Sequence, residues 1–271
     1  LSLNEVNYLL NPLNFSINVS TKNPKILLED KSLDLSDITT NISLKSFINN
    51  QFSIYNLKIS TKEIQIKDLI SLTGVVKGSP QLFVLDNITK AGLISANINL
   101  SFDLDGEIKN NYQINGGIKK AKFNIFNQVE IENLNLSFDI SKNQFILRKI
   151  ETDINSIKLK SPLIKIEEKK NIFFIDGKVI NDQQNFDINK LKPILGDLLN
   201  AIETEKIDFN SINTFSFNVN KKLKLNDLKL ETNLNLKNFK IVKNPLNLKT
   251  FLPNYTEQVK LEDHKIKIKL T

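Results

Sequence analysis

The chain has 271 residues, of which 40% are hydrophobic and 25% charged, and its net charge is +7. This composition excludes a globally disordered chain, and the length suffices for one large domain or two ordinary ones. The absence of cysteine excludes disulfides, thiolate metal sites and cysteine nucleophiles. The basic residues are lysines spread among Asp and Glu, apart from the single arginine, Arg148. We therefore expect lysine-rich solvated sheet faces and no nucleic-acid partner, although the charge is compatible with weak attraction to an anionic membrane.

The first 66 residues are expected to form strands, because apolar and polar side chains alternate with period two. Methionine is absent even at position 1, and apolar runs such as "DLISLTGVV" are too short to span a bilayer. We expect the chain to be a mature form or a part of a longer one. The strands predicted in this part lie near 14–20, 24–29, 38–45 and 52–60.

Helical signals are few. Two short amphipathic helices are predicted near 67–76 and 80–90, where Ser79 is placed to cap the second helix and Pro80 to occupy its first turn. A further helix is predicted over 187–203, where leucine and isoleucine recur at helical spacing. So little helix cannot cover both faces of the predicted sheet, which argues against a doubly wound α/β fold.

After the helices the alternation resumes and continues to the end of the chain. "INLSFDL" (98–104) and "HKIKIKL" (264–270) each place apolar residues on one face and polar residues on the other. Such alternation predicts an antiparallel sheet with one apolar face. The other strands predicted in this part lie near 109–125, 129–140, 143–150, 155–166, 171–180, 206–213, 214–219, 223–230 and 232–242.

Four predicted strands keep their alternation but shift its phase by one residue. In "VEIENLNLSFDI" (129–140) the apolar residues before Asn133 have one parity and those after it have the other. Similar shifts centre on Asn56, Asp227 and Asn238. One extra residue that reverses the facing set is typical of a β-bulge, which bends a strand and increases its twist. A tight turn between two short strands, or chance in an Asn-rich composition, would give a similar pattern.

The sequence contains no recognisable catalytic or metal-binding arrangement. His264 is the only histidine and has no partner at coordination spacing. The acidic pairs alternate with apolar residues on solvated strand faces, and Gly116-Gly117 fits neither a dinucleotide fingerprint nor a P-loop. We therefore predict no enzymatic activity, no metal and no cofactor.

The apolar face of the sheet supports two interpretations. If two sheets close on each other, it is the core of a structural or adhesive β protein without cargo. If a single sheet curls and stays open, its concave face offers a surface for acyl chains. Inward positions are almost uniformly Leu, Ile, Val and Phe, with few polar groups for selecting a polar ligand.

Two stretches repeat a pattern of strands and short helices: "NPKILLEDKSLDLSDITTNISLKSFINNQFSIYNLKISTKEIQIKDLISL" (23–72) and "AGLISANINLSFDLDGEIKNNYQINGGIKKAKFNIFNQVEIENLNLSFDI" (91–140). Both resemble the AsmA-like family of repeating β-groove proteins of the Gram-negative envelope, which includes TamB. The first contains, in order, a strand pattern, an "NL" pair and an amphipathic helix that begins with Lys-Asp-Leu. In the second, a helix gives way to a Gly-started strand and later to an "NLxφxF" strand. The similarity lies in the succession of strand and helix patterns and includes no invariant catalytic motif.

The resemblance implies a mainly β fold in which a long curled antiparallel sheet forms an open, taco-like groove. Residues 1–271 would form a single elongated β-groove region of a longer chain. Its parts would be strands in 1–66, a helical hairpin in 67–91, and strands in 92–271 with the helical insertion at 187–203.

The resemblance also implies that the groove shields and conducts phospholipid acyl chains between the inner and outer membranes. The partners would be phospholipid and membrane or envelope proteins at the groove ends. The location would be the periplasm, with a tether to the inner membrane outside this chain. The candidate floor residues are Ile98, Leu100, Phe102, Leu104, Ile118, Phe123, Ile125, Leu134, Leu136, Phe138 and Ile140.

Overall fold

A computed structural model describes residues 1–28, 31–76, 80–125, 129–191, 206–220, 224–241, 251, 253–254 and 259–270. Its strands form one 15-stranded sheet in which every pair is antiparallel. The order runs β1, β2, β4, β5 and then β7 to β15 consecutively, while β3 pairs with β4 and β6 with β7. The alternating sequence therefore folds as a meander of neighbouring strands.

The N-terminal strands are mostly short and the later ones are long. The first six are β1 (Val6–Asn11), β2 (Ser16–Lys22), β3 (Lys25–Leu28), β4 (Lys31–Ser43), β5 (Ile54–Thr61) and β6 (Ile64–Gln65). The others, each of 11 to 17 residues, are β7 (Thr89–Ser101), β8 (Gln113–Ile125), β9 (Val129–Ser141), β10 (Gln144–Ile154), β11 (Ile157–Lys169), β12 (Ile172–Asp187), β13 (Lys206–Asn220), β14 (Leu225–Ile241) and β15 (Val259–Leu270).

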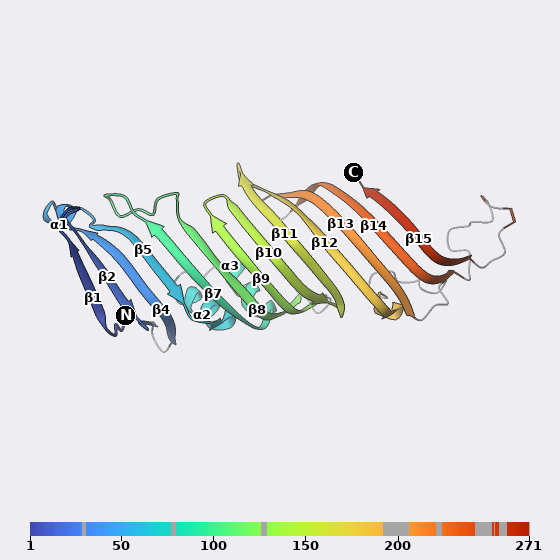
Figure 1. The fold of residues 1–271 in the computed structure, drawn as a ribbon, viewed down its shortest axis with the longest axis horizontal. Helices are drawn as coiled ribbons and strands as arrows, with labels where there is room; N and C mark the ends of the chain where they lie inside the picture. The colour runs from blue at the N-terminus through green and yellow to red at the C-terminus, as the bar shows by residue number, and fades with distance from the viewer. Residues whose placement is uncertain are drawn as a thin grey trace.

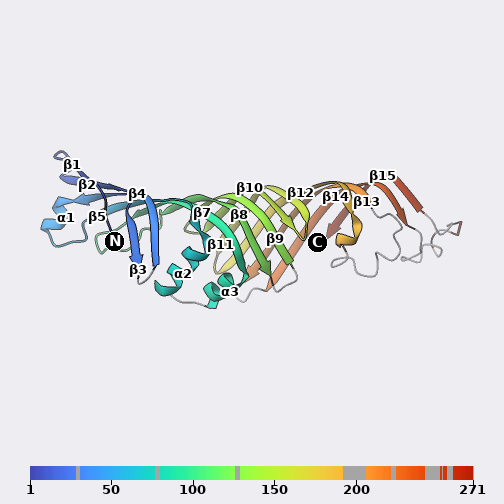
Figure 2. The same cartoon turned by 90° about the horizontal axis from the view of Figure 1, so that it is seen from below.

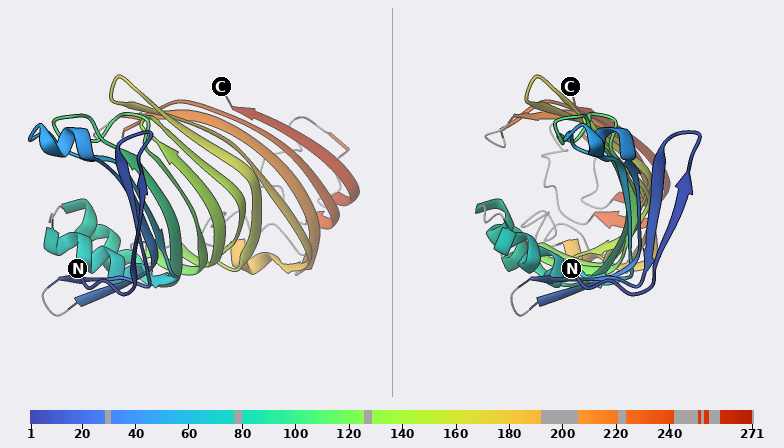
Figure 3. Two further views of the ribbon diagram at one scale, coloured as in Figure 1. Left: turned by 60° about the vertical axis from the view of Figure 1, so that its left-hand side comes forward. Right: turned by 90° about the vertical axis from the view of Figure 1, so that its left-hand side faces the viewer.

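The sheet curls into a groove that stays open along one side (Figures 1 and 3). Each long strand forms an arc across the groove, so the strand ends make two lips with the concave face between them (Figure 3). The first lip carries the β1–β2 turn, helix α1 (Leu44–Ile48) and the β7–β8 loop; the second carries α2 (Ile66–Val76) and α3 (Pro80–Ile88). Within the described residues, β1 and β15 end the strand order and do not pair with each other. The predicted open, curled antiparallel sheet is therefore the observed fold.

Helices α2 and α3 correspond to the two helices predicted near 67–76 and 80–90. Figure 2 shows both beneath the curve of β7 and β8. Helix α3 begins at Pro80, as expected, whereas the predicted cap Ser79 lies outside the described residues. Of the helix predicted over 187–203, the described part consists of the end of β12 and the short 3₁₀ helix η1 (Ile188–Leu191). The remainder lies outside the described residues.

Buried apolar clusters lie where these helical elements cover the sheet. One joins Leu33 and Leu35 of β4 to Leu72 of α2, and another joins Ile66 and Ile70 of α2 to Ala121 of β8. A third lies beside η1 and consists of Ile157, Phe186, Ile188 and Ile207. The described residues thus have their apolar clusters along the second lip, and no single central core.

Three strand predictions are corrected by the structure. Segments 206–213 and 214–219 form the single strand β13, and the described parts of segments 223–230 and 232–242 belong to the single strand β14 (Leu225–Ile241). The strand predicted over 98–104 ends at Ser101, because the Asp103 carboxylate accepts hydrogen bonds from the N–H groups of Asp105 (3.0 Å) and Glu107 (2.9 Å). Those bonds fold the following residues into a turn. The sequence also gave no indication of helix α1, whose first turn is capped by the Ser43 hydroxyl.

Candidate functional site

The concave face carries an uninterrupted line of apolar cross-strand neighbours. It crosses nine consecutive strands of the order, from β4 to β13, and every member is half-buried. In an open sheet such a line is a continuous apolar strip, because directly opposed side chains lie about 5 Å apart. Its members are Ile38, Ile59, Ile98, Ile114, Ile140, Phe145, Ile166, Ile175 and Phe217. We call this line, together with the apolar neighbours of the same facing, the groove floor.

A second line runs beside the first and contains two glycines next to phenylalanines. Gly116 lies opposite Phe138, and a Cβ on Gly116 would approach the Phe138 ring to 2.7 Å. Gly177 lies opposite Phe215 in the same way, at 2.8 Å from the ring. Because no side chain occupies these two positions, each ring can lie across the neighbouring strand. The two glycines therefore leave space for the rings of Phe138 and Phe215, so that these large side chains need not project further into the groove than their neighbours.

Packing against the helices identifies the apolar face as the concave one. Ile66 and Ile70 of α2 form a buried cluster with Ala121, against which Ile118 and Leu134 also pack. The end-on view in Figure 3 places α2 and α3 inside the curve of the sheet. Residues of the same facing as Ile118 and Leu134 therefore point into the groove.

The phase shift at Asn133 is a bulge that keeps both halves of β9 on this face. Asn133 has a φ of 53° inside a continuous strand. On β8, Phe123 pairs with Ile131 and Ala121 with Leu134, so β9 contains one extra residue between these pairs. Asn133 Nδ2 also donates to Asp153 Oδ2 on β10 (2.8 Å). The extra residue turns Leu134 and its successors to the same side as Ile131.

The other three predicted bends differ from one another, although the strand is continuous through each. Asp227 has a φ of 51° and lies at a register shift between β13 and β14. In β5 the register shift falls at Tyr55, one residue before Asn56. At Asn238 the pairing with β15 keeps its register, which corrects the bulge predicted there.

The predicted floor residues divide between strands and a loop. Phe102 and Leu104 lie beyond the end of β7; Phe102 bridges to Ile108, and Leu104 is 51% exposed in the loop at the first lip. Leu104 is therefore not part of the floor. The others lie in β7, β8 or β9 with the groove-facing parity: Ile98, Leu100, Ile118, Phe123, Ile125, Leu134, Leu136, Phe138 and Ile140.

Charged groups lie on the opposite side of these strands. Lys122 forms ion pairs with Glu130 (2.8 Å) and Glu132 (2.6 Å), whose hydrogen bonds raise the pKa of the Lys122 ammonium. Arg148 similarly pairs with Asp139 (3.2 Å). All five have the parity opposite to the floor residues. Paired and solvated charges on the convex face leave the groove floor without ionised groups among these strands.

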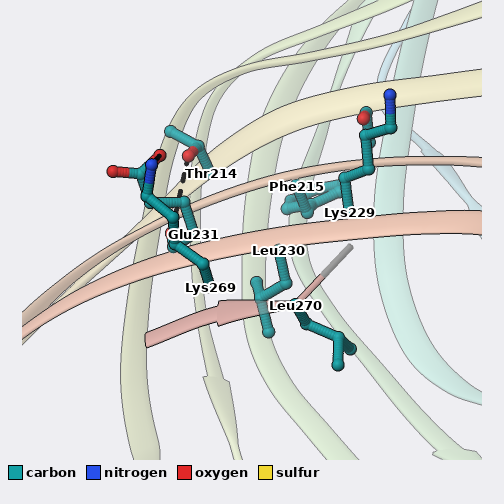
Figure 4. Close-up of a pocket in the computed structure, with 8 residues that line it drawn as sticks. Thr214, Phe215, Lys229, Leu230, Glu231, Lys269 and Leu270 are labelled. Atoms are coloured by element: carbon teal, nitrogen blue, oxygen red, sulfur yellow. Dashed lines mark hydrogen bonds and ion pairs between the residues drawn. The ribbon is translucent and has the colours of Figure 1, made fainter. Parts of the chain in front are cut away.

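A shallow depression of about 320 Å³ marks the β15 end of the sheet (Figure 4). Phe215, Leu230 and Leu270 form its apolar part and continue the second line of the floor. Glu231 and Lys269 lie apart from them, with Lys269 Nζ 3.7 Å from Glu231 Oε2. The apolar surface therefore extends to the last strand.

The described residues contain no cluster of three or more His, Asp or Glu side chains able to hold a metal ion. His264, the single histidine, lies in β15 with its backbone opposite Leu236. None of the helices in the described ranges is both long and apolar enough to cross a bilayer. The feature that could bind a ligand is thus the groove itself, and its apolar floor suits hydrocarbon.

Comparisons with protein-family models, with curated proteins and with solved structures gave no match for this chain.

Proposed function

We propose that the groove binds phospholipid acyl chains and conducts them along its floor, shielded from water, between the inner and outer membranes of a cell envelope. The carrying observation is the line of half-buried apolar residues that crosses β4 to β13 on the concave face of an open sheet. In a closed sandwich, sheet-on-sheet packing would bury such residues.

The energetics favour hydrocarbon as the occupant. Removing a methylene group from water is worth roughly 0.8 kcal/mol, so each acyl chain gains many times this amount in the groove. The floor is built from Ile, Leu, Val and Phe without ionised groups in β7 to β9, so it offers no deep binding minimum. A lipid can therefore shift from one strand to the next with little change in contact energy.

The dimensions fit several acyl chains. The strand path contains thirteen strands, and with a spacing of about 4.8 Å the groove is about 60 Å long. One acyl chain occupies about half of the ~30 Å hydrocarbon core of a bilayer, or roughly 15 Å. The resemblance to AsmA-like proteins supports the same function. It also suggests a periplasmic location, a tether to the inner membrane outside this chain, and envelope proteins as partners at the groove ends.

The test uses a matched pair of isoleucines in neighbouring strands. Ile140 lies on the floor opposite Phe145, whereas Ile146 lies on the convex face opposite Asp139, and both are half-buried. Ile140→Asp places a carboxylate where acyl chains would lie, and Ile146→Asp adds the same charge outside the groove. Native mass spectrometry of gently extracted protein should find bound phospholipid in the unmodified protein and in Ile146→Asp. The amount of bound phospholipid should fall by about an order of magnitude in Ile140→Asp, since removing the unpaired carboxylate from water costs a large free energy.

The alternative function is that of a structural or adhesive β protein whose apolar face serves only as core. It predicts lipid-free protein throughout, and it predicts that Ile140→Asp unfolds the chain. Recovery of the folded, unmodified protein without phospholipid from membranes extracted in mild detergent would reject the lipid-conducting function.

A further inference from the structure

The apolar floor is interrupted by a group of polar side chains on β12, β13 and β14. Asn181 has the same facing as the floor residue Ile175, because β12 and β13 pair without a register shift from Ile172 to Gln183. Ser211 lies directly opposite Asn181, and further polar residues of the same facing continue from there to β14. We call this group the polar patch; its members are Asn181, Ser211, Asn213 and Thr232.

Hydrogen bonds within the polar patch fix the side-chain amide of Asn213. Its Nδ2 donates to Ser211 Oγ (3.0 Å) and to the Val179 carbonyl (3.3 Å), and its Oδ1 accepts from Thr232 Oγ1 (2.9 Å). Both ends of the Asn213 amide are thus engaged. Ser211 Oγ accepts one of these bonds, so its own hydroxyl proton remains to be donated elsewhere.

Asn181 is buried but stands apart from this network. The residue is 7% exposed, and its Oδ1 accepts no hydrogen bond from any residue that the structure describes. Gln183, the next residue of β12 with this facing, donates from Nε2 to the Lys158 carbonyl (3.0 Å). A buried acceptor without a donor destabilises a fold, so Asn181 Oδ1 marks a position where a ligand with a donor group is favoured.

The geometry of the pair suits a hydroxyl group. Asn181 and Ser211 are directly opposed across β12 and β13, and the Cβ atoms of such a pair lie about 5 Å apart. One oxygen atom between the two side chains is therefore within hydrogen-bond reach of both. A hydroxyl group is a donor and an acceptor at once, so it can donate to Asn181 Oδ1 and accept from Ser211 Oγ.

The surroundings of the polar patch indicate that the rest of the ligand is hydrocarbon and uncharged. The patch consists of amides and hydroxyls without Lys or Arg, so it lacks the charged donors that bind phosphate strongly. The residues that border it along β13 and β14 with the same facing are apolar: Phe209, Phe215, Leu230 and Leu234. A free hydroxyl group attached to acyl chains, as in a diacylglycerol, has the chemistry that this arrangement requires.

We propose that the polar patch binds the free hydroxyl group of a neutral glycerolipid whose acyl chains lie on the adjoining groove floor. The hydroxyl group donates to Asn181 Oδ1 and accepts from Ser211 Oγ. This inference rests on the proposed function, because it requires a groove that binds acyl chains. It adds a class of lipid and a fixed position at β12 and β13, where a lipid that moves along the floor is retained if it carries a free hydroxyl group.

The test compares two short-chain probes by isothermal titration calorimetry with the full chain. One is dihexanoylglycerol, and the other is the matching propanediol dihexanoate, which has a hydrogen atom in place of the hydroxyl group. The unmodified protein should bind dihexanoylglycerol roughly tenfold more tightly, because the second probe leaves the polar groups of the patch unpaired. Asn181→Leu removes the acceptor at nearly constant volume and should abolish this preference, with the affinity for propanediol dihexanoate at least retained.

Asn235→Leu is the matched control. Asn235 Oδ1 in β14 is also buried without a partner among the described residues, but Asn235 pairs with Asn210 on the convex face. This variant should keep the roughly tenfold preference. Ser211→Ala removes the other partner of the hydroxyl group and should lower the preference in the same direction as Asn181→Leu, so it provides the test if Asn181→Leu does not fold.

The outcomes separate this inference from the proposed function. If the unmodified protein binds both probes equally, or if Asn181→Leu and Ser211→Ala both keep the preference, the polar patch is not a lipid site, although the groove still binds acyl chains. Loss of the preference in Asn235→Leu would also reject the patch, since the discrimination would not depend on the concave face. If neither probe binds, the proposed function fails and this inference fails with it.

Discussion

The bulge at Asn133 can be tested by substitutions that separate backbone conformation from hydrogen bonding. An L-residue held in the left-handed region costs about 1–2 kcal/mol, least for Asn and Gly and most for β-branched residues. Asn133→Val adds this strain and removes the 2.8 Å bond to Asp153, worth about 1 kcal/mol at a solvated site. The expected loss of unfolding free energy is about 2–3 kcal/mol. Asn133→Gly removes the same bond but relaxes φ, so the expected loss is at most about 1 kcal/mol.

Asn97→Val provides the matched control. Asn97 lies in β7 and donates to Asn115 Oδ1 (3.2 Å), and it is not among the residues with positive φ. Valine suits an extended strand, so this change should cost less than about 1 kcal/mol. The free energies come from urea unfolding followed by circular dichroism. If Asn133→Val costs no more than Asn97→Val, or if Asn133→Gly costs as much as Asn133→Val, backbone conformation does not determine the bulge and the reasoning fails.

Two other substitutions test the floor and the ion pairs. Gly116→Ala should lower the free energy of urea unfolding by at least about 2 kcal/mol, because the Cβ of the alanine would collide with backbone atoms and a ring. In the control, Gly117→Ala, the Cβ meets only a carbonyl oxygen at 3.3 Å, so the loss should be less than about 1 kcal/mol. Equal losses in the two variants would contradict the close fit at Gly116. Hydrogen bonds from Lys165 and Lys169 lower the pKa of Glu167 to about 2, so its contribution to stability is full above about pH 4.5 and is lost as the pH falls towards 2. Glu167→Gln should therefore flatten the dependence of the urea midpoint on pH between 4.5 and 2, and an unchanged slope would exclude this cluster as its source.

The sequence pattern predicted the class of the fold, because alternation of apolar and polar residues with period two directly indicates a sheet with one apolar and one solvated face. It also located the bulges at Asn133 and Asp227, since Asn and Asp tolerate positive φ and the apolar phase changes beside them. The bulge residues Lys120 and Lys149 also have positive φ but were not predicted, because lysine carries no such preference.

The groove itself was only partly predictable. The same apolar face serves a closed sandwich and an open groove, and the choice depends on the long-range curl of the sheet, which no local pattern encodes. Alternation also continued past the end of β7, so Leu104 was placed on the floor although the turn at Asp103 had already redirected the chain. The "DLDG" sequence at 103–106 was the available signal for that turn.

Because β7 to β15 follow one another in the sheet in the order of the sequence, this part of the molecule is a one-dimensional array of strands. Among the described residues, each strand from β8 to β14 pairs only with its two neighbours, so stability is approximately a sum of strand terms and nearest-neighbour interfaces, as in repeat proteins. Removing or adding one hairpin therefore changes the number of rungs without altering the cross-section of the groove. Length and cross-section are thus separate properties of this architecture: hairpin number sets the first, and strand length with bulge position sets the second.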